Sequence, residues 1–312
     1  MHLPNITLCC IDNQYPDLGF DALLLSTQDC SFDEVIFFTR SGFVPLQHSI
    51  PNLTIIAIDQ ICDLTTYSEF IIKGLDQYIR TSHALIVQWD GFITHPDLWQ
   101  ERFLEFDYIG APWPTKERLL VGNGGFSLRS KKLLGALQDP AIIAKHPEDQ
   151  CICLTNRSYL EDYYGITFAP SELAEQFAFE LQRPAFDCFG FHAVRNLPLV
   201  LSTPHLLELI QKLPPKLIFT EQFSQLIETC QGLRSPEVMA ALKEQILSLT
   251  RSMSEDMLSS RQYRHIIKTC IRRRLHRLAF DALLSRIKVT GWNADALFLL
   301  VRIFSHQLLH RF

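Results

Sequence analysis

The residue best placed to take part in binding or catalysis is Asp90, in the stretch ALIVQWDGF at residues 84–92. The apolar residues before it run without alternation, as in a strand that is buried on both faces of a sheet. Asp90 therefore lies where that strand leaves the core, and Gly91 after it permits many backbone conformations. A carboxylate held rigidly at a sheet edge can serve a metal and diphosphate site. The alternative is an ordinary turn, because Asp-Gly is a common turn pair.

Three later stretches contain residue types that can bind or react. The glycine-rich run VGNGGFSLRS at residues 121–130 either lets the backbone approach a ligand closely or forms only a tight hairpin. Glu148 and Asp149 open a helix about twenty residues later, where acids either cap the helix or return to the same cleft as the glycines. His192 follows an aromatic run, and a histidine in such a place is either a ligand or a core residue.

The elements that must position these residues alternate between strands and helices. Apolar, β-branched runs predict strands at residues 6–11, 34–39, 53–58 and 84–87, and amphipathic spacing predicts helices at 19–27 and 67–80. Alternation of this kind indicates an α/β fold with a mostly parallel sheet flanked by helices.

In open sheets of this class, ligands bind beyond the carboxyl ends of the strands. Asp12 and Asp90 both follow such ends, so we expect them to flank one cleft. The sequence contains neither a GxxxxGK[ST] motif nor a GxGxxG motif after a strand, which argues against a P-loop kinase and a classical NAD enzyme.

The charge distribution predicts two domains. The chain has 312 residues and a net charge of −5, but residues 1–200 alone carry −12 and residues 251–312 carry +8. Residues 1–200 are the expected catalytic domain, and residues 201–312 the expected C-terminal α-helical domain. Six helices are predicted there, at residues 204–212, 220–230, 236–252, 260–275, 279–289 and 293–309.

The cysteines and the pattern of apolar residues indicate the cellular compartment in which the protein is expected. Nine scattered cysteines, many inside apolar strings, indicate reduced core thiols rather than a disulfide framework or a zinc site. No secretory leader precedes the first strand, and no apolar run reaches the length of roughly 18 residues that a membrane span requires. We therefore expect a cytoplasmic protein, with peripheral binding at the inner membrane as an alternative.

Four motifs in this order resemble the active-site series of GT-A-type glycosyltransferases. They are QWDG (88–91), GNGGFSLRS (122–130), PEDQ (147–150) and FGFH (189–192). More closely, IGAPW, VGNGGFSLRS and FGFH resemble a bacterial glycosyltransferase-like family catalogued mainly as a domain of unknown function. The resemblance covers roughly residues 5–200 and implies a GT-A, Rossmann-like fold.

The resemblance also implies an activity and its ligands. It implies transfer of a sugar from a nucleotide-diphosphate donor, with UDP the expected nucleotide, in bacterial surface glycan or glycoconjugate synthesis. The acceptor would be a glycan, a lipid-linked molecule or a protein. A divalent cation, Mn²⁺ or Mg²⁺, would be bound by Asp90 and His192. The usual DxD motif is here Gln88-Trp89-Asp90, so only its last carboxylate is present.

The remaining site residues follow from the same resemblance and from position. An acceptor hydroxyl must lose its proton as it attacks, and Asp149 is the expected base, with Glu148 orienting it or binding acceptor. A base in this position fits inversion at the anomeric carbon. Asp12, Gln88, Trp89 and Asp90 are assigned to the donor nucleotide, and Trp113, Asn123, Gly124 and Gly125 to the sugar and acceptor.

Two other classes of function stay open. A non-catalytic nucleotide-sugar or glycan-binding module would explain the missing first carboxylate. A nucleotidyltransferase on a related fold would be expected to carry a basic glycine-rich loop near the N-terminus, but residues 9–20 contain no Lys or Arg.

The basic C-terminal region, with Arg272, Arg273 and Arg274, is either a solvated face or a dock for an anionic membrane or partner protein. Binding to nucleic acid is not expected, because no known nucleic-acid-binding module accompanies the charge.

Overall fold

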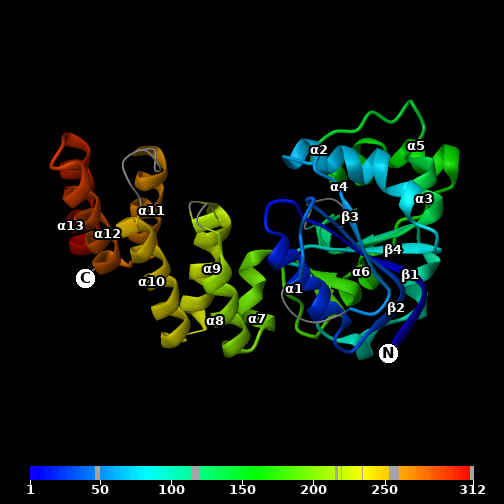
Figure 1. Ribbon diagram of the computed structural model, residues 1–312, viewed down its shortest axis with the longest axis horizontal. Coiled ribbons are helices and arrows are strands. Elements are labelled where there is room, and N and C mark those ends of the chain that lie inside the picture. The colour runs from blue at the N-terminus through cyan, green and yellow to red at the C-terminus, as the bar shows by residue number, and fades with distance from the viewer. Residues whose placement is uncertain are drawn as a thin grey trace. The chain divides into compact units, whose positions relative to one another are not determined.

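The computed structural model describes residues 1–45, 50–113, 120–214, 217–218, 220–233, 235–252 and 260–309. The chain divides into two compact units, Met1–Ala193 and Val194–Phe312 (Figure 1). The first unit is built on a central sheet with helices on both faces, and the described part of the second unit is helical.

The central sheet confirms the predicted α/β class. Its six strands follow the order β3-β2-β1-β4-β8-β5. The first four strands in the chain run parallel, and β8 is antiparallel to both of its neighbours, so the sheet is mostly parallel. The strands are β1 (His2–Ile11), β2 (Ser31–Thr39), β3 (Leu53–Ala57), β4 (His83–Val87), β5 (Tyr108–Gly110) and β8 (Ser127–Ser130).

The strand order places a topological switch point between β1 and β4. From β1 the chain proceeds outward through β2 and β3, and it then returns to the other side of β1 with β4. Cys10 pairs with Val87, so the residues that follow each strand leave the sheet side by side. This crevice is where open α/β sheets bind their ligands, and Asp12 and Asp90 are the acids that follow the two strands.

Alternate residues of the strands pack into two separate core layers. Leu8 and Cys10 of β1 join the cluster that includes Phe20 and Leu23 of α1. Their neighbours Cys9 and Ile11 join the cluster on the opposite face, which includes Ile71. Figure 1 shows α1 and α6 on one side of the sheet and α2 on the other. The helices of this unit are α1 (Pro16–Thr27), α2 (Leu64–Glu69), α3 (Lys131–Ala136), α4 (Glu148–Gln150), α5 (Arg157–Tyr164) and α6 (Ser171–Phe177).

The segment predicted as an amphipathic helix at residues 67–80 is helical as far as Tyr78, but it is not α-helical throughout. Helix α2 ends at Glu69, a π-helical turn follows at Phe70–Gly74, and a 3₁₀ turn occupies Leu75–Tyr78. The apolar spacing indicates which side of the segment is buried, whether the turns are α-helical, π-helical or 3₁₀. It therefore could not report the change of hydrogen-bonding pattern.

Two small sheets complete the first unit. Strands β6 (Pro112–Trp113) and β7 (Leu120–Val121) pair antiparallel, and β9 (Ala178–Phe179) and β10 (Gly190–Phe191) pair parallel. Eight of the nine cysteines are buried, and all nine are free thiols, as predicted.

The second unit consists of helices that pack mainly on neighbours close in sequence. Helix α12 contacts α10, α11 and α13, and α10 also contacts α8 and α9. None of the helices in the described ranges is long and apolar enough to cross a membrane. The helices are α7 (Leu197–Val200), α8 (Thr203–Lys212), α9 (Glu221–Gly232), α10 (Pro236–Ser252), α11 (Ser260–Arg272), α12 (His276–Thr290) and α13 (Ala294–Leu309).

Candidate functional site

A tight turn after β4 holds Asp90 in place. The backbone N–H groups of Gln88 and Gly91 each donate to the carbonyl of the other residue, at 3.0 and 2.9 Å. Trp89 and Asp90 therefore form the tip of a closed two-residue loop. The Asp90 side chain is buried, with only 4% of the residue exposed. A carboxylate in this position needs a charged or hydrogen-bonding partner.

Asp12 lies near Asp90, at the end of β1. Its Oδ1 accepts hydrogen bonds from the backbone N–H groups of Gln14 and Tyr15, at 2.9 and 2.6 Å. Burial raises the pKa of Asp12 to about 6, and the charge of Asp90 adds to the rise, while those two hydrogen bonds oppose it. The ring of Tyr15 also meets that of Trp89 edge-on, with the centroids 6.4 Å apart. The two strand ends therefore lie close together.

The partner of Asp90 is His192, which arrives on the small parallel sheet. Gly190 pairs with Ala178 and Phe191 with Phe179, so His192 and Glu180 leave the sheet at the same level. Nε2 of His192 lies 3.5 Å from Oδ1 of Asp90, and Nδ1 lies 3.4 Å from Oε1 of Glu180. The imidazole therefore lies between two carboxylates.

These carboxylates control the charge of the imidazole. Burial by itself lowers the pKa of His192, but the negative charges and hydrogen bonds of Asp90 and Glu180 outweigh it and raise the pKa to about 10. In the absence of any other cation, His192 is thus positively charged at neutral pH. The site is built to hold positive charge beside Asp90.

The glycine-rich run contacts both the histidine and the acidic pair. A Cβ atom on Gly125 would lie 2.1 Å from Nε2 of His192, and one on Gly124 would lie 1.7 Å from Oε1 of Glu148. Side chains at these two positions are therefore excluded. Asn123 before them has φ 65°, and its Oδ1 accepts a hydrogen bond from the Gly125 N–H at 3.1 Å. The run is a close-contact loop, which only glycine permits at these points.

The two acids differ in their surroundings: Glu148 is buried in an ion pair, and Asp149 is partly accessible to solvent. Glu148 is 6% exposed, and its Oε1 lies 3.3 Å from Nη2 of Arg129, which is fully buried. Asp149 is partly exposed and accepts a hydrogen bond from the Gln150 N–H at 2.8 Å. Burial raises the pKa of Asp149, as does the charge of Glu148, while hydrogen bonds from the Gln150 and Gly124 backbone and the charge of Arg129 act in the opposite direction.

Trp113 lies against the same loop. A Cβ atom on Gly122 would lie 2.2 Å from Cζ2 of the indole, so the ring covers the backbone at the start of the glycine run. Trp113 is partly exposed. It can thus offer a ring surface next to Asn123.

The structure brings the predicted site residues together at one end of the sheet, and it adds residues that sequence reasoning missed. The sequence places Arg129 only in a predicted strand, although an arginine four positions after Gly125 could suggest an ion pair near the glycine run. Glu180 was not singled out, because its proximity to His192 depends on the pairing of β9 with β10. Tyr67, whose hydroxyl accepts a hydrogen bond from the side chain of Gln88, is placed by the sequence only in a predicted helix.

The ligand types at this site fit a divalent cation in part. Asp90 supplies one oxygen and His192 one nitrogen, which Mn²⁺ accepts, and Mg²⁺ prefers oxygen. Among the residues that the structure describes, no cluster of three or more His, Cys, Asp and Glu side chains has the arrangement of a metal site. Two protein ligands of these types therefore need further oxygen atoms, such as those of a diphosphate.

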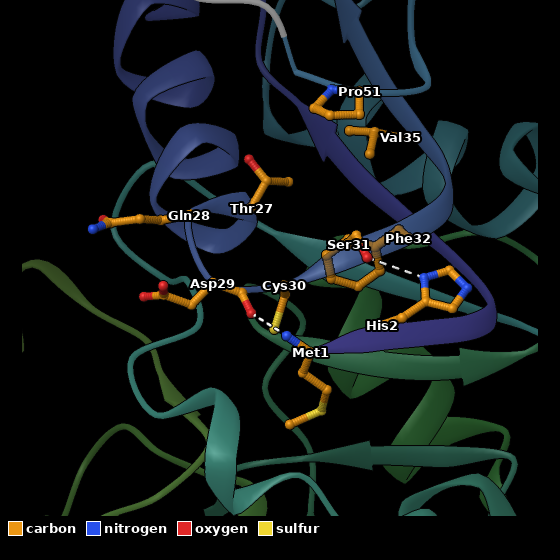
Figure 2. Close-up of a pocket in the computed structure, with 10 residues that line it drawn as sticks. All are labelled: Met1, His2, Thr27, Gln28, Asp29, Cys30, Ser31, Phe32, Val35 and Pro51. Atoms are coloured by element: carbon orange, nitrogen blue, oxygen red, sulfur yellow. Dashed lines mark hydrogen bonds between the residues drawn. The ribbon is translucent and has the colours of Figure 1, made fainter.

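A separate hollow lies at the other end of the sheet. It has a volume of about 500 Å³ and is lined by the starts of β1 and β2 and by the end of α1 (Figure 2). The figure shows His2 directed toward Ser31, whose Oγ lies 3.0 Å from its Nδ1. The carboxyl ends of the parallel strands lie at the opposite edge, so this hollow is separate from the candidate site.

The three consecutive arginines of the second unit are partly engaged within it. Nη2 of Arg272 lies 3.8 Å from Glu221, and Nη1 of Arg273 lies 2.6 Å from Glu228. Both glutamates belong to α9. Arg272 and Arg274 are nevertheless exposed to solvent.

Comparison with protein families finds one match. Residues 52–192 match the family described as "Protein of unknown function (DUF5672)". The matched range contains Asp90, the glycine run, the acidic pair and His192, and it excludes Asp12. The curated proteins include no match to this sequence.

Proposed function

We propose that the first unit is a GT-A-type glycosyltransferase, which moves a sugar from a UDP-sugar or a related nucleotide-diphosphate donor to an acceptor hydroxyl. One observation carries the proposal. The glycine run contacts Glu148 and His192, and His192 contacts Asp90, which follows β4 beside the crevice between β1 and β4. Open α/β sheets bind nucleotides in this crevice.

Asp90 and His192 are the residues that would hold Mn²⁺ or Mg²⁺. A bound divalent cation stabilises the negative charge that develops on a departing diphosphate. Asp90 is fixed by its closed turn, and the ring of His192 lies against Gly125. Metal binding would require His192 to lose a proton, because the two carboxylates around it raise its pKa and favour the charged imidazole when no metal is bound.

Asp149 is the proposed general base. Its carboxylate would accept the proton of the acceptor hydroxyl as the oxygen attacks the anomeric carbon from the face opposite the diphosphate, which inverts the configuration. The raised pKa makes Asp149 a stronger base than a solvated aspartate. Glu148 is held by Arg129 and therefore serves to position the loop and its neighbour rather than to exchange protons.

The remaining predicted residues have places that suit donor and acceptor binding. Asp12 and Trp89 lie beside Asp90 and would contact the nucleotide. Asn123 has its Nδ2 buried without a hydrogen-bond partner among the described residues. An amide donor in this state would gain from a sugar hydroxyl, and the Trp113 ring next to it could stack on the sugar.

Replacement of Asp90 by alanine should weaken Mn²⁺-dependent UDP binding by at least about 100-fold, because the carboxylate ligand is lost. Loss of even an outer-shell partner typically costs 10–100-fold in metal affinity. Calorimetric titration of UDP with and without Mn²⁺ measures the effect. Asp97→Ala is the matched control, because Asp97 is an exposed aspartate seven positions along the same segment. Unchanged metal-dependent affinity in Asp90→Ala would refute the site.

The second unit is proposed to bring the enzyme to an anionic membrane. Its helix α13 exposes Leu297, Phe298, Val301 and Phe304, each between 49% and 60% exposed, on the side away from the buried Ile303. An exposed apolar helix face in a domain rich in basic residues suits the interface of an anionic bilayer.

Replacement of Arg272, Arg273 and Arg274 by glutamine should lower binding to anionic vesicles by at least about tenfold, since each cation near such a surface contributes about 1 kcal/mol. Salt should reduce wild-type binding in the same way, because the Debye length falls to about 10 Å at 0.1 M. Co-sedimentation with vesicles measures both. UDP binding should be unchanged in the variant. Equal vesicle binding at low salt would instead assign these arginines to their contacts with α9.

A further inference from the structure

Gln88 brings a third potential ligand atom to the candidate metal site. Its side-chain Oε1 lies 3.2 Å from Nε2 of His192, the same nitrogen that lies 3.5 Å from Oδ1 of Asp90. One carboxylate oxygen and one amide oxygen thus both lie close to the same imidazole nitrogen. Gln88 occupies the position at which a DxD motif has its first carboxylate.

The amide of Gln88 is oriented with its oxygen toward this point. Its Nε2 donates to the hydroxyl of Tyr67 at 2.8 Å, which leaves Oε1 on the side of His192. The backbone of Gln88 is also fixed, because it closes the turn with Gly91. Both the chain and the side chain are therefore held before any ligand binds.

Glu180 orients the imidazole in the corresponding way. Its carboxylate lies beside Nδ1, so a neutral imidazole can donate from Nδ1 to Glu180 and present the lone pair of Nε2 to the site. Carboxylates in this position behind a ligating histidine are common in metalloproteins. Adjacent ligands in an octahedral shell with bonds of 2.0–2.1 Å lie roughly 3 Å apart. The two measured separations from Nε2, 3.2 and 3.5 Å, are close to that value.

We propose that Gln88 is a protein ligand of the divalent cation, binding through its amide oxygen alongside Asp90 and His192. This inference rests on the glycosyltransferase function proposed above. A neutral amide in place of a carboxylate lowers the negative charge of the site by one. The protein alone then binds the cation weakly, and tight binding requires the charges of the nucleotide diphosphate.

The test is the affinity of the full-length protein for Mn²⁺ without nucleotide, measured by the electron paramagnetic resonance signal of free Mn²⁺. Gln88→Glu keeps the size of the side chain and adds a charge, so it should tighten Mn²⁺ binding at least about tenfold, because ligand charge tunes affinity for hard cations. Gln88→Leu should weaken it by about 10–100-fold. Gln77→Glu is the control for added charge, because Gln77 is exposed and its Nε2 donates to the nearby Gly74 carbonyl.

The direction in which Gln88→Glu changes Mn²⁺ affinity distinguishes a metal ligand from a residue that only accepts a hydrogen bond. If Gln88 only accepts a hydrogen bond from His192, a carboxylate there holds the imidazole more firmly, and Gln88→Glu weakens Mn²⁺ binding; this result overturns the inference. If Asp90→Ala weakens binding but both Gln88 variants match wild type, Gln88 is not a ligand while the proposed metal site stands. If Asp90→Ala also has no effect, the metal site and the inference both fail.

A second variant covers the case in which Gln88→Leu does not fold. Tyr67→Phe removes only the hydroxyl that holds the amide, and it should weaken Mn²⁺ binding several-fold without changing the far-ultraviolet circular dichroism spectrum. Wild-type Mn²⁺ affinity in a folded Tyr67→Phe protein, together with unchanged affinity in Gln88→Glu, also overturns the inference.

Discussion

Replacement of Asp149 by asparagine should lower the rate of sugar transfer by about 10²- to 10⁴-fold, which is the usual contribution of a general base. Asparagine keeps the shape of the side chain and the oxygen that accepts from the Gln150 N–H, so the local fold should survive. It cannot accept a proton at neutral pH. Donor binding, measured by titration with the UDP-sugar, should therefore stay within about twofold of wild type.

The pH dependence provides a second measurement of the same role. Because burial and Glu148 raise the pKa of Asp149 above its ordinary value, transfer by the wild-type enzyme should fall as the pH drops through that raised pKa. The residual activity of Asp149→Asn should lack this step. Asp162→Asn is the matched control, since Asp162 is an exposed aspartate on α5, and it should transfer sugar at the wild-type rate.

A substitution of the neighbouring acid, Glu148, tests whether the roles of Glu148 and Asp149 are assigned correctly. Glu148→Gln leaves the charge of Arg129 buried without its partner, and breaking a buried ion pair costs about 3–5 kcal/mol. Its main effect should be a lower melting temperature.

If Glu148→Gln stops transfer at a temperature where it is folded, while Asp149→Asn stays active, the two roles are reversed. If both stay active, neither acid is the general base and the inverting mechanism is wrong. Tight UDP-sugar binding by the wild type without turnover would favour the non-catalytic module.

Replacement of Gly125 by alanine should abolish Mn²⁺-dependent UDP binding and with it sugar transfer. The added Cβ would lie 2.1 Å from Nε2 of His192, far inside van der Waals contact, so the ring must leave its place between Asp90 and Glu180. Overpacking of this kind typically costs about 1–3 kcal/mol of stability. Calorimetry of UDP with Mn²⁺ and a thermal unfolding curve measure the two effects separately.

Gly135→Ala is the matched control for this substitution. Gly135 lies in α3, and a Cβ atom there meets nothing within 4 Å. Alanine in a helix lowers the entropy of the unfolded chain, so this variant should be more stable by about 0.4–1 kcal/mol and should bind UDP normally. Normal metal-dependent binding by Gly125→Ala would mean that His192 is not needed at the position seen here.

The α/β class and the location of the site were predictable from local patterns. Short, continuous apolar runs such as residues 84–87 favour strands that are buried on both faces, and strands of this kind alternating with helices indicate a mostly parallel sheet. Such a sheet has functional residues after its strands, so Asp12 and Asp90 could be placed near each other before the strand order was known. The four motifs could be recognised because residue types at short spacing are visible in the sequence itself.

The partners of these residues were decided only by the tertiary structure. Glu180 meets His192 because β9 pairs with β10, and Arg129 meets Glu148 because β8 runs antiparallel beside β4 and brings its buried face to the start of α4. Contacts between residues distant in the chain depend on strand register, which local patterns do not encode. The pKa values of Asp149 and His192 depend in turn on burial and on those charged neighbours. The sequence by itself therefore determined which residue types could form a site, while the packing decided which of them meet and in which charge state.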